Sequence, residues 1–119
     1  MFQKFVKNCG SNLSGTGGSI ISPSYPNIYG NNNYCEWTIT STTAKSINIT
    51  IVAFSTEAPH DKLVILDSAT CALATPVLSG SAPQITVPQT IATGKKKLTL
   101  LFYTDSSVVA TGFNLTWKA

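Results

Sequence analysis

The sequence contains no arginine and carries little charge of either sign. Eight lysines supply all the fixed positive charge, five aspartates and glutamates oppose them, and charged residues make up 11% of the 119 positions. Base-specific contacts and bidentate phosphate contacts favour Arg, so this composition argues against a nucleic-acid-binding protein. Because 43% of the residues are hydrophobic, the composition also excludes an intrinsically disordered chain.

Long hydrophobic runs and helical periodicity are also missing. No apolar run approaches the roughly 20 residues that a membrane-spanning helix needs. The stretch before Cys9 is too short for a secretory signal peptide, so we expect any leader to lie outside this sequence. The length of 119 residues predicts a single domain. Since no segment shows a sustained 3.6-residue period, long helices are not expected in it.

Cysteine is scarce, and its spacing excludes one kind of site. No C-x-x-C pair is present, which argues against a structural zinc site. Cys9 and Cys35 enclose a loop that is typical of a disulfide in a secreted module. Cys71 is left over, as a buried thiol, a thiol that seeks a partner, or a cysteine whose mate lies outside the sequence.

What the sequence does contain is alternating apolar and polar residues, which predict β-strands. Glycines punctuate the first 18 residues, which predicts an irregular arm there. The segments at 34–40 and 46–52 are expected to pair antiparallel with one buried face. Together the strands predict an all-β sandwich or barrel, with strands at 19–22, 34–40, 46–52, 62–67, 84–87, 98–104 and 111–117.

The order and spacing of several short motifs resemble the CUB domain family, the extracellular β-sandwich module of complement proteases, developmental metalloproteases and spermadhesins. The motifs are Cys9-Gly10, I-S-P-S-Y-P-N-I-Y at 21–29, C-E-W at 35–37, F-x-x-E at 54–57, D-K-L-V-I-L-D at 61–67, L-x-L-x-F-x-x-D-x-S at 98–107 and G-F-N-L-T-W at 112–117. The resemblance implies a jelly-roll-like sandwich of two antiparallel sheets over residues 9–119, preceded by an arm at 1–8. It also implies a secreted or extracellular protein.

The resemblance assigns roles to the cysteines. It pairs Cys9 with Cys35 as the first family disulfide and leaves Cys71 as a free thiol. The second family disulfide is missing, because its cysteines would stand just before Asp61 and near residues 78–80. This absence implies less covalent restraint on the loops at 54–61 and 68–83.

Many CUB domains bind one calcium ion at the end of the sandwich, and the matching positions are present here. The resemblance implies ligands at Glu57, Asp61, Asp105, Ser107 and the carbonyl of Val108. Calcium prefers six to eight oxygen ligands, and carboxylates that repel one another need a cation between them. The alternative is three solvated loop carboxylates that bind no metal.

In the family, this calcium ion orders loops that hold a protein partner, and a ligand oxygen accepts a partner lysine. The resemblance therefore implies an extracellular protein partner and a supporting role for Tyr29, which orients one carboxylate. Glu57, Asp105, Tyr29 and His60 would line the contact. We interpret the chain as a non-enzymatic interaction module.

Two other classes of function use the same residues. A carbohydrate-binding sandwich would contact glycan through Tyr25, Tyr29 and Tyr34, and an accessory domain of a secreted protease would differ only in its context. Catalysis is disfavoured, because the sequence has no G-x-S-x-G or similar motif to hold a serine nucleophile for His60 to activate. A glycosidase would need two of the acidic residues in a deep polar cleft, and the sequence of a small sandwich gives no sign of one.

Three further features allow two interpretations each. Lys95-Lys96-Lys97 is predicted to be a solvated hairpin turn after Gly94, or else a heparin-like or phosphate contact. Sequons begin at Asn12, Asn48 and Asn114; they predict N-glycosylation, or else arise by chance in a chain rich in Ser and Thr. Five apolar residues on the predicted outer face indicate ordinary surface or arm contacts, or a docking patch for self-association or a neighbouring domain: Val52, Val64, Leu66, Leu101 and Tyr103.

Overall fold

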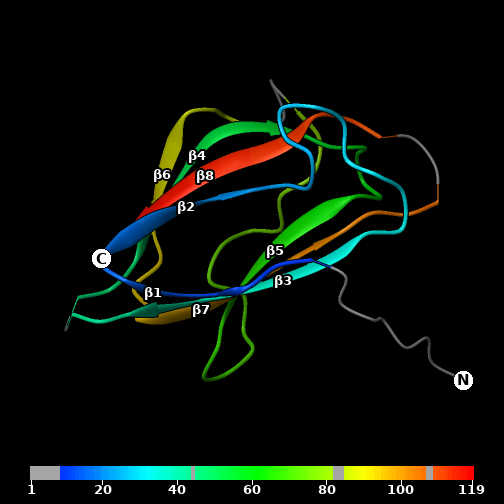
Figure 1. Cartoon of the computed structure of the whole chain (residues 1–119). Helices are drawn as coiled ribbons and strands as arrows, with labels where there is room; N and C mark the ends of the chain where they lie inside the picture. Colours follow the sequence, from blue (N-terminus) through cyan, green and yellow to red (C-terminus); the bar gives the residue numbers. More distant parts are fainter. Residues whose placement is uncertain (1–8, 44, 82–84, 107–108) are drawn as a thin grey trace, which may run out of the picture.

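The computed structural model describes residues 9–43, 45–81, 85–106 and 109–119 and contains eight β-strands in two sheets (Figure 1). The first four strands are β1 (Asn12–Gly15), β2 (Gly17–Ile21), β3 (Tyr34–Ser41) and β4 (Asn48–Ser55). The others are β5 (Lys62–Asp67), β6 (Gln89–Ala92), β7 (Lys97–Tyr103) and β8 (Gly112–Lys118). The predicted all-β, two-sheet sandwich is therefore confirmed.

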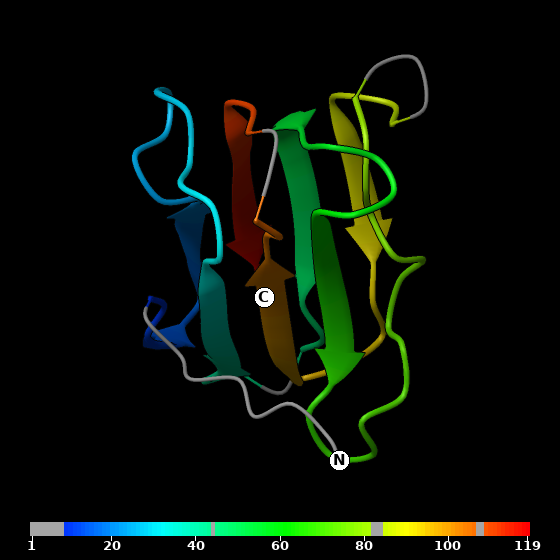
Figure 2. The ribbon, with the colours of Figure 1, turned by 90° about the vertical axis from the view of Figure 1, so that its right-hand side faces the viewer.

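The two sheets each contain four strands and pack face to face. One sheet has the order β1-β3-β7-β5, and the other has the order β2-β8-β4-β6 (Figure 2). All neighbouring strands are antiparallel except β1 and β3, which run parallel. The expectation of purely antiparallel sheets is thus wrong at this edge.

The core forms where the alternating apolar faces of the two sheets meet. Phe113 of β8 lies at its centre, with its ring 5.0 Å from Phe102 and 5.8 Å from Trp37, both of which belong to the opposite sheet. Phe54 stacks on Phe113 from the neighbouring strand at 6.2 Å. Because these rings are buried, the aromatic contacts hold the sheets together beyond the area that they bury.

The strands at 34–40 and 46–52 do not pair with each other as expected. They belong to different sheets, with β3 beside β1 and β7, and β4 beside β8 and β6. Their buried residues do alternate as predicted, but the two apolar faces meet across the core. An alternating pattern shows which face of a strand is buried and does not show whether its partner lies beside it or opposite it.

Two local predictions are also wrong. The stretch at 12–18, expected to be irregular, contributes β1 and the first two residues of β2, both of which are edge strands. The strand expected at 84–87 is replaced by β6, which begins only after Pro88, and residue 84 lies outside the described residues. Proline has no N–H for the ladder, so it precedes the strand.

The long loop between β2 and β3 is fastened at its start by Ser22. Its N–H donates to the Phe113 carbonyl at 3.0 Å, and its Oγ accepts the Phe113 N–H at 2.9 Å. Gly112 makes this approach possible, because its φ of +85° is left-handed and a Cβ there would collide with the Ser22 side chain. At the other end of the loop, Cys35 forms a disulfide with Cys9, which holds β1 beside β3.

Asp67 closes the far end of β5. Its carboxylate accepts hydrogen bonds from the Ala69 N–H and the Thr70 hydroxyl, each at 3.0 Å, and lies 3.6 Å from the Lys95 ammonium. The Ala69 N–H is the main cause of a lowered Asp67 pKa, with Thr70 and Lys95 adding to it. Asp67 therefore holds the turn after β5 more strongly when it is ionised than when it is protonated.

Replacing Asp67 with Asn should make the stability depend less on pH. A carboxyl whose pKa is lowered in the folded state stabilises fully above its unfolded pKa of about 3.9, and this contribution is lost as pH falls through the folded value. We expect Asp67→Asn to melt below the wild type near neutral pH and the difference to shrink in acid. Thermal melts followed by circular dichroism at several pH values test this. A constant difference down to the most acidic pH would contradict it.

Candidate metal site

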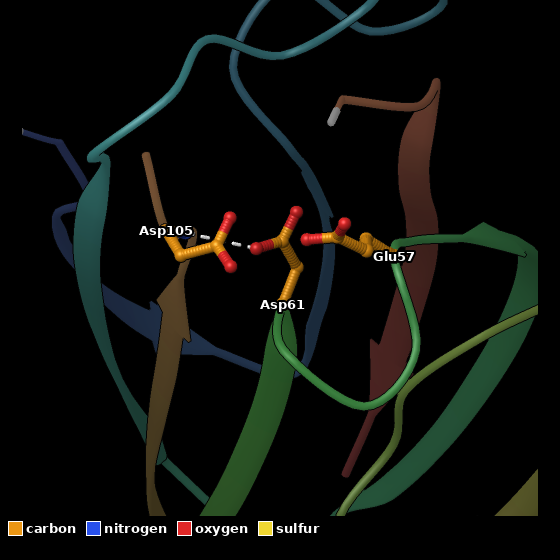
Figure 3. A group of neighbouring side chains, drawn as sticks. All are labelled: Glu57, Asp61 and Asp105. Atoms are coloured by element: carbon orange, nitrogen blue, oxygen red, sulfur yellow. Dashed lines mark hydrogen bonds between the residues drawn. The ribbon is translucent and has the colours of Figure 1, made fainter. Parts of the chain in front are cut away.

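Three acidic residues from two loops meet at one end of the sandwich. Glu57 follows β4, Asp61 directly precedes β5, and Asp105 follows β7. Since Lys62 and Tyr103 are register partners in the antiparallel pair of β5 and β7, Asp61 and Asp105 emerge at the same edge. One carboxylate oxygen from each of the three residues lies within 4.8 Å of the others (Figure 3).

Asp61 is the buried member of this carboxylate cluster, which we define as Glu57, Asp61 and Asp105. Its side chain is 0% exposed, and it lies between the other two carboxylates in Figure 3. Oδ2 accepts the Tyr29 hydroxyl at 2.6 Å, and Oδ1 accepts the Asp105 N–H at 2.9 Å. Each carboxylate oxygen has two lone pairs, so both oxygens retain the capacity to bind a cation.

Glu57 is incompletely satisfied. Its Oε1 is buried and has no hydrogen-bond partner among the described residues. Burial raises the pKa of Glu57, and the negative charge of Asp105 raises it further. An unpaired buried oxygen beside two other carboxylates indicates a site that lacks positive charge.

The donor set of the carboxylate cluster fits a hard cation. All three side chains offer oxygen, which suits calcium or magnesium better than the nitrogen and sulfur ligands that zinc prefers. Calcium tolerates irregular geometry and takes further oxygens from carbonyls and water. Glu57, Asp61 and Asp105 are the described residues that would hold it.

Hydrogen bonds join the segment at 56–61 to residues 79–80, the two places between which the expected second disulfide is missing. The Thr56 N–H donates to the Gly80 carbonyl at 2.8 Å, and the Gly80 N–H donates to Thr56 Oγ1 at 3.0 Å. Thr56 Oγ1 and Ser79 Oγ both donate to the Asp61 carbonyl, at 3.0 and 2.7 Å. Thr56 and Ser79 position Asp61, but the sequence did not single them out, because Ser and Thr are common along the whole chain.

Tyr29 supports the carboxylate cluster from the core side. It is 1% exposed, its ring meets the edge of Phe102 at 5.3 Å, and its hydroxyl also accepts the Glu57 N–H at 3.3 Å. Burial and the hydrogen bond to Asp61 raise the Tyr29 pKa, which keeps the phenol a donor. Because it is buried, Tyr29 cannot contact a partner directly or stack on a sugar, contrary to expectation.

The other predicted site residues are placed less centrally. His60 is exposed on the loop beside Asp61, whereas Ser107 and Val108 lie outside the described residues. Tyr25 and Tyr34, proposed for glycan contact, are half-buried. The structure therefore brings together the three carboxylates and Tyr29 from the predicted set.

The predicted outer-face apolar patch is divided between the two sheets. Val64, Leu66, Leu101 and Tyr103 lie half-buried on the outer face of β5 and β7, but Val52 lies in the other sheet at a bulge of β4, so the five residues do not form one patch.

Cys71 is a free, exposed thiol, which excludes the buried alternative. Of the sequon asparagines, Asn12 and Asn48 are exposed and Asn114 is half-buried. Within the described residues, no helix has the length and apolar character to cross a membrane.

Comparison with known proteins identifies relatives over nearly the whole chain. Residues 9–117 match the CUB domain family. Rat (Rattus norvegicus) cubilin is 37% identical over 124 aligned positions, which cover 98% of this chain and 3% of cubilin. Mouse (Mus musculus) tolloid-like protein 2 is 33% identical, with 88% of this chain and 10% of that protein covered. The chain thus spans only a small part of the curated relatives that it matches.

Solved structures show the same fold. The full extracellular region of zebrafish Gpr126/Adgrg6 superposes with a TM-score of 0.75 and 26% identity over 90% of this chain and 14% of that one. The MASP-1 CUB2 domain bound to Ca²⁺ gives a TM-score of 0.72 and 22% identity, covering 96% of this chain and all of that domain.

Removing the Tyr29 hydroxyl should destabilise the loop end. Tyr29→Phe leaves a buried ionised carboxylate without one donor, so we expect the free energy of unfolding to fall by roughly 1.5–3 kcal/mol. Tyr25→Phe is the matched control, because no hydrogen bond to the Tyr25 hydroxyl is found among the described residues. Urea unfolding in chelator measures both variants, and equal effects would contradict the assigned role.

Proposed function

Because the chain belongs to the CUB domain family, we propose that it is a non-enzymatic, extracellular binding module whose loop end binds calcium and then a protein partner. The observation that carries the proposal is the carboxylate cluster, in which three acidic side chains converge and Glu57 Oε1 is buried without a partner. Calcium, when bound, would neutralise these carboxylates and tie together the loops that carry them.

The similarity to solved structures also supports this proposal. A solved domain of the same fold, MASP-1 CUB2, is bound to Ca²⁺. The matching region of zebrafish Gpr126/Adgrg6 belongs to an extracellular region, and the disulfide between Cys9 and Cys35 also suits an oxidising environment. The functions of the large relatives as whole proteins are not carried over to this module.

The partner contact would form around the accessible part of the carboxylate cluster. Glu57 and Asp105 are half-buried, so each presents some surface while Asp61 stays inside. A carboxylate oxygen held in this way can accept a hydrogen bond from an ammonium group of the partner, and lysine is the side chain that carries a compact ammonium group. Exposed His60 and Ile28, the latter 59% exposed next to Tyr29, extend the surface with polar and apolar contacts.

Glu57→Gln should separate calcium binding from folding. The substitution removes a charge that burial and Asp105 disfavour, so we expect its stability in chelator to equal or exceed that of the wild type. Calcium at about 100 times its dissociation constant should add about 2.7 kcal/mol to the wild type and almost nothing to the variant. Calorimetric titration and thermal melts measure these effects.

The control for this experiment is Glu36→Gln, which changes the same charge on a half-buried residue of β3. It should keep the full calcium response. Absence of heat on titrating the wild type, together with identical melting in calcium and chelator, would contradict the calcium site.

Asp105→Ala should weaken calcium binding and partner binding together, because one side chain serves both. We expect immobilised wild-type protein to retain its extracellular partner in calcium and to release it in chelator, and Asp105→Ala to retain little in either condition. Surface plasmon resonance with the purified partner gives both affinities. Loss of calcium binding with unchanged partner affinity would break the link between them.

A further inference from the structure

The end of the sandwich opposite the carboxylate cluster collects most of the lysines. Lys118 is the last residue of β8, and Lys97 is the first residue of β7. Lys95 and Lys96 precede β7, and Lys45 precedes β4 and lines the same hollow as Lys118. All five side chains are exposed, and we call them the lysine end.

The backbone beneath this lysine end is tightly held. The carbonyls of Lys95, Lys96 and Lys97 accept hydrogen bonds from the N–H groups of Ile47, Ser41 and Ser68, at 2.7, 2.9 and 3.2 Å. The predicted hairpin turn is wrong, because this segment crosses from β6 of one sheet to β7 of the other. Since all three carbonyls are occupied, the ammonium groups are what this segment presents to solvent.

These charges are largely uncompensated. Lys95 lies 3.6 Å from Asp67, and in the described part of the chain the other four lysines of this end make no ion pair. The remaining described acidic residues are Glu36 on β3 and the three of the carboxylate cluster at the opposite end. Clustered like charges repel one another, so an anionic ligand would be favoured there and would be attracted from a distance.

A shallow hollow lies within this charged surface. It measures about 540 Å³ and is lined by Lys45, Ser46, Asn48, Lys118 and Ala119. The lining thus includes residues that carry two ammonium groups, a hydroxyl and an amide, and these donors suit the oxygens of a sugar sulfate or carboxylate. Asn48 is also a sequon asparagine, so a glycan attached there would occupy the hollow.

The chemistry of this end favours one class of anion. Nucleic acid is recognised through Arg and exposed aromatic rings, but this chain has no Arg, and Trp117 beside Lys118 is only 3% exposed. A single phosphate would meet few of the five ammonium groups. A polymer with repeated anionic groups meets several at once and gains affinity by multivalency. We propose that the lysine end binds a sulfated polysaccharide, independently of calcium.

Heparin, used as the probe with protein that carries no N-glycan, tests this proposal. We expect Lys95→Gln/Lys96→Gln/Lys97→Gln to lose at least about tenfold in affinity at physiological salt and to show a shallower dependence on salt. A second variant, Lys45→Gln/Lys118→Gln, removes no described ion pair and should also bind more weakly. Thermal melts of both variants verify that they are folded.

The matched control is Lys62→Gln, compared with Lys96→Gln, because the two single variants change the net charge equally. Lys62 begins β5 at the carboxylate end. This control should keep most of the affinity, as should Glu57→Gln and wild-type protein in chelator. Because heparin binding is expected to be independent of calcium, a failure of this proposal can be distinguished from a failure of the calcium proposal.

Three results would overturn the inference. The first is no heparin binding by the wild type at physiological salt. The second is an equal loss in the control, which would mean attraction by net charge alone. The third is binding to vesicles that contain phosphatidylserine without binding to heparin, which would assign the lysine end to a membrane surface.

Discussion

The burial of the Asp61 charge is the constraint on which the loop end of this protein depends. A carboxylate taken fully out of water is costly unless donors surround it. Tyr29 reaches it from the core, and the Asp105 N–H reaches it from the loop after β7. Its own carbonyl is held by Thr56 and Ser79. One residue thus joins four chain segments, so the position of each depends on the others.

The molecule separates its charges along the strands. Acidic side chains gather where β4 and β7 end, and lysines gather where β7 begins and β8 ends, so the net charge of +3 conceals two ends of opposite sign. The sandwich between them is apolar inside and tied by aromatic contacts around Phe113. Two binding surfaces at such ends would act independently, because neither shares loops with the other.

Much of the fold followed from alternation along the chain. The apolar positions of β3, such as Trp37 and Ile39, and of β4, such as Ile49 and Ile51, are buried as predicted. Strand partners did not follow, because β3 and β4 show the same pattern whether they pair side by side or pack face to face. The edge strands β1 and β6 also escaped prediction, since each has only four residues, too few to show a clear alternation, and none of these residues is fully buried.

The order of motifs along the chain determined the family, the fold class and the pairing of Cys9 with Cys35, because strand spacing and cysteine positions are properties of the linear sequence. It also singled out Glu57, Asp61 and Asp105, which the structure places together. Only the tertiary structure decided that Tyr29 is buried, that Thr56 and Ser79 hold the loop without a second disulfide, and that lysines from three segments converge. These features arise from contacts between residues far apart in the chain, and hydroxyls and lysines carry no local signal of the partners they will meet.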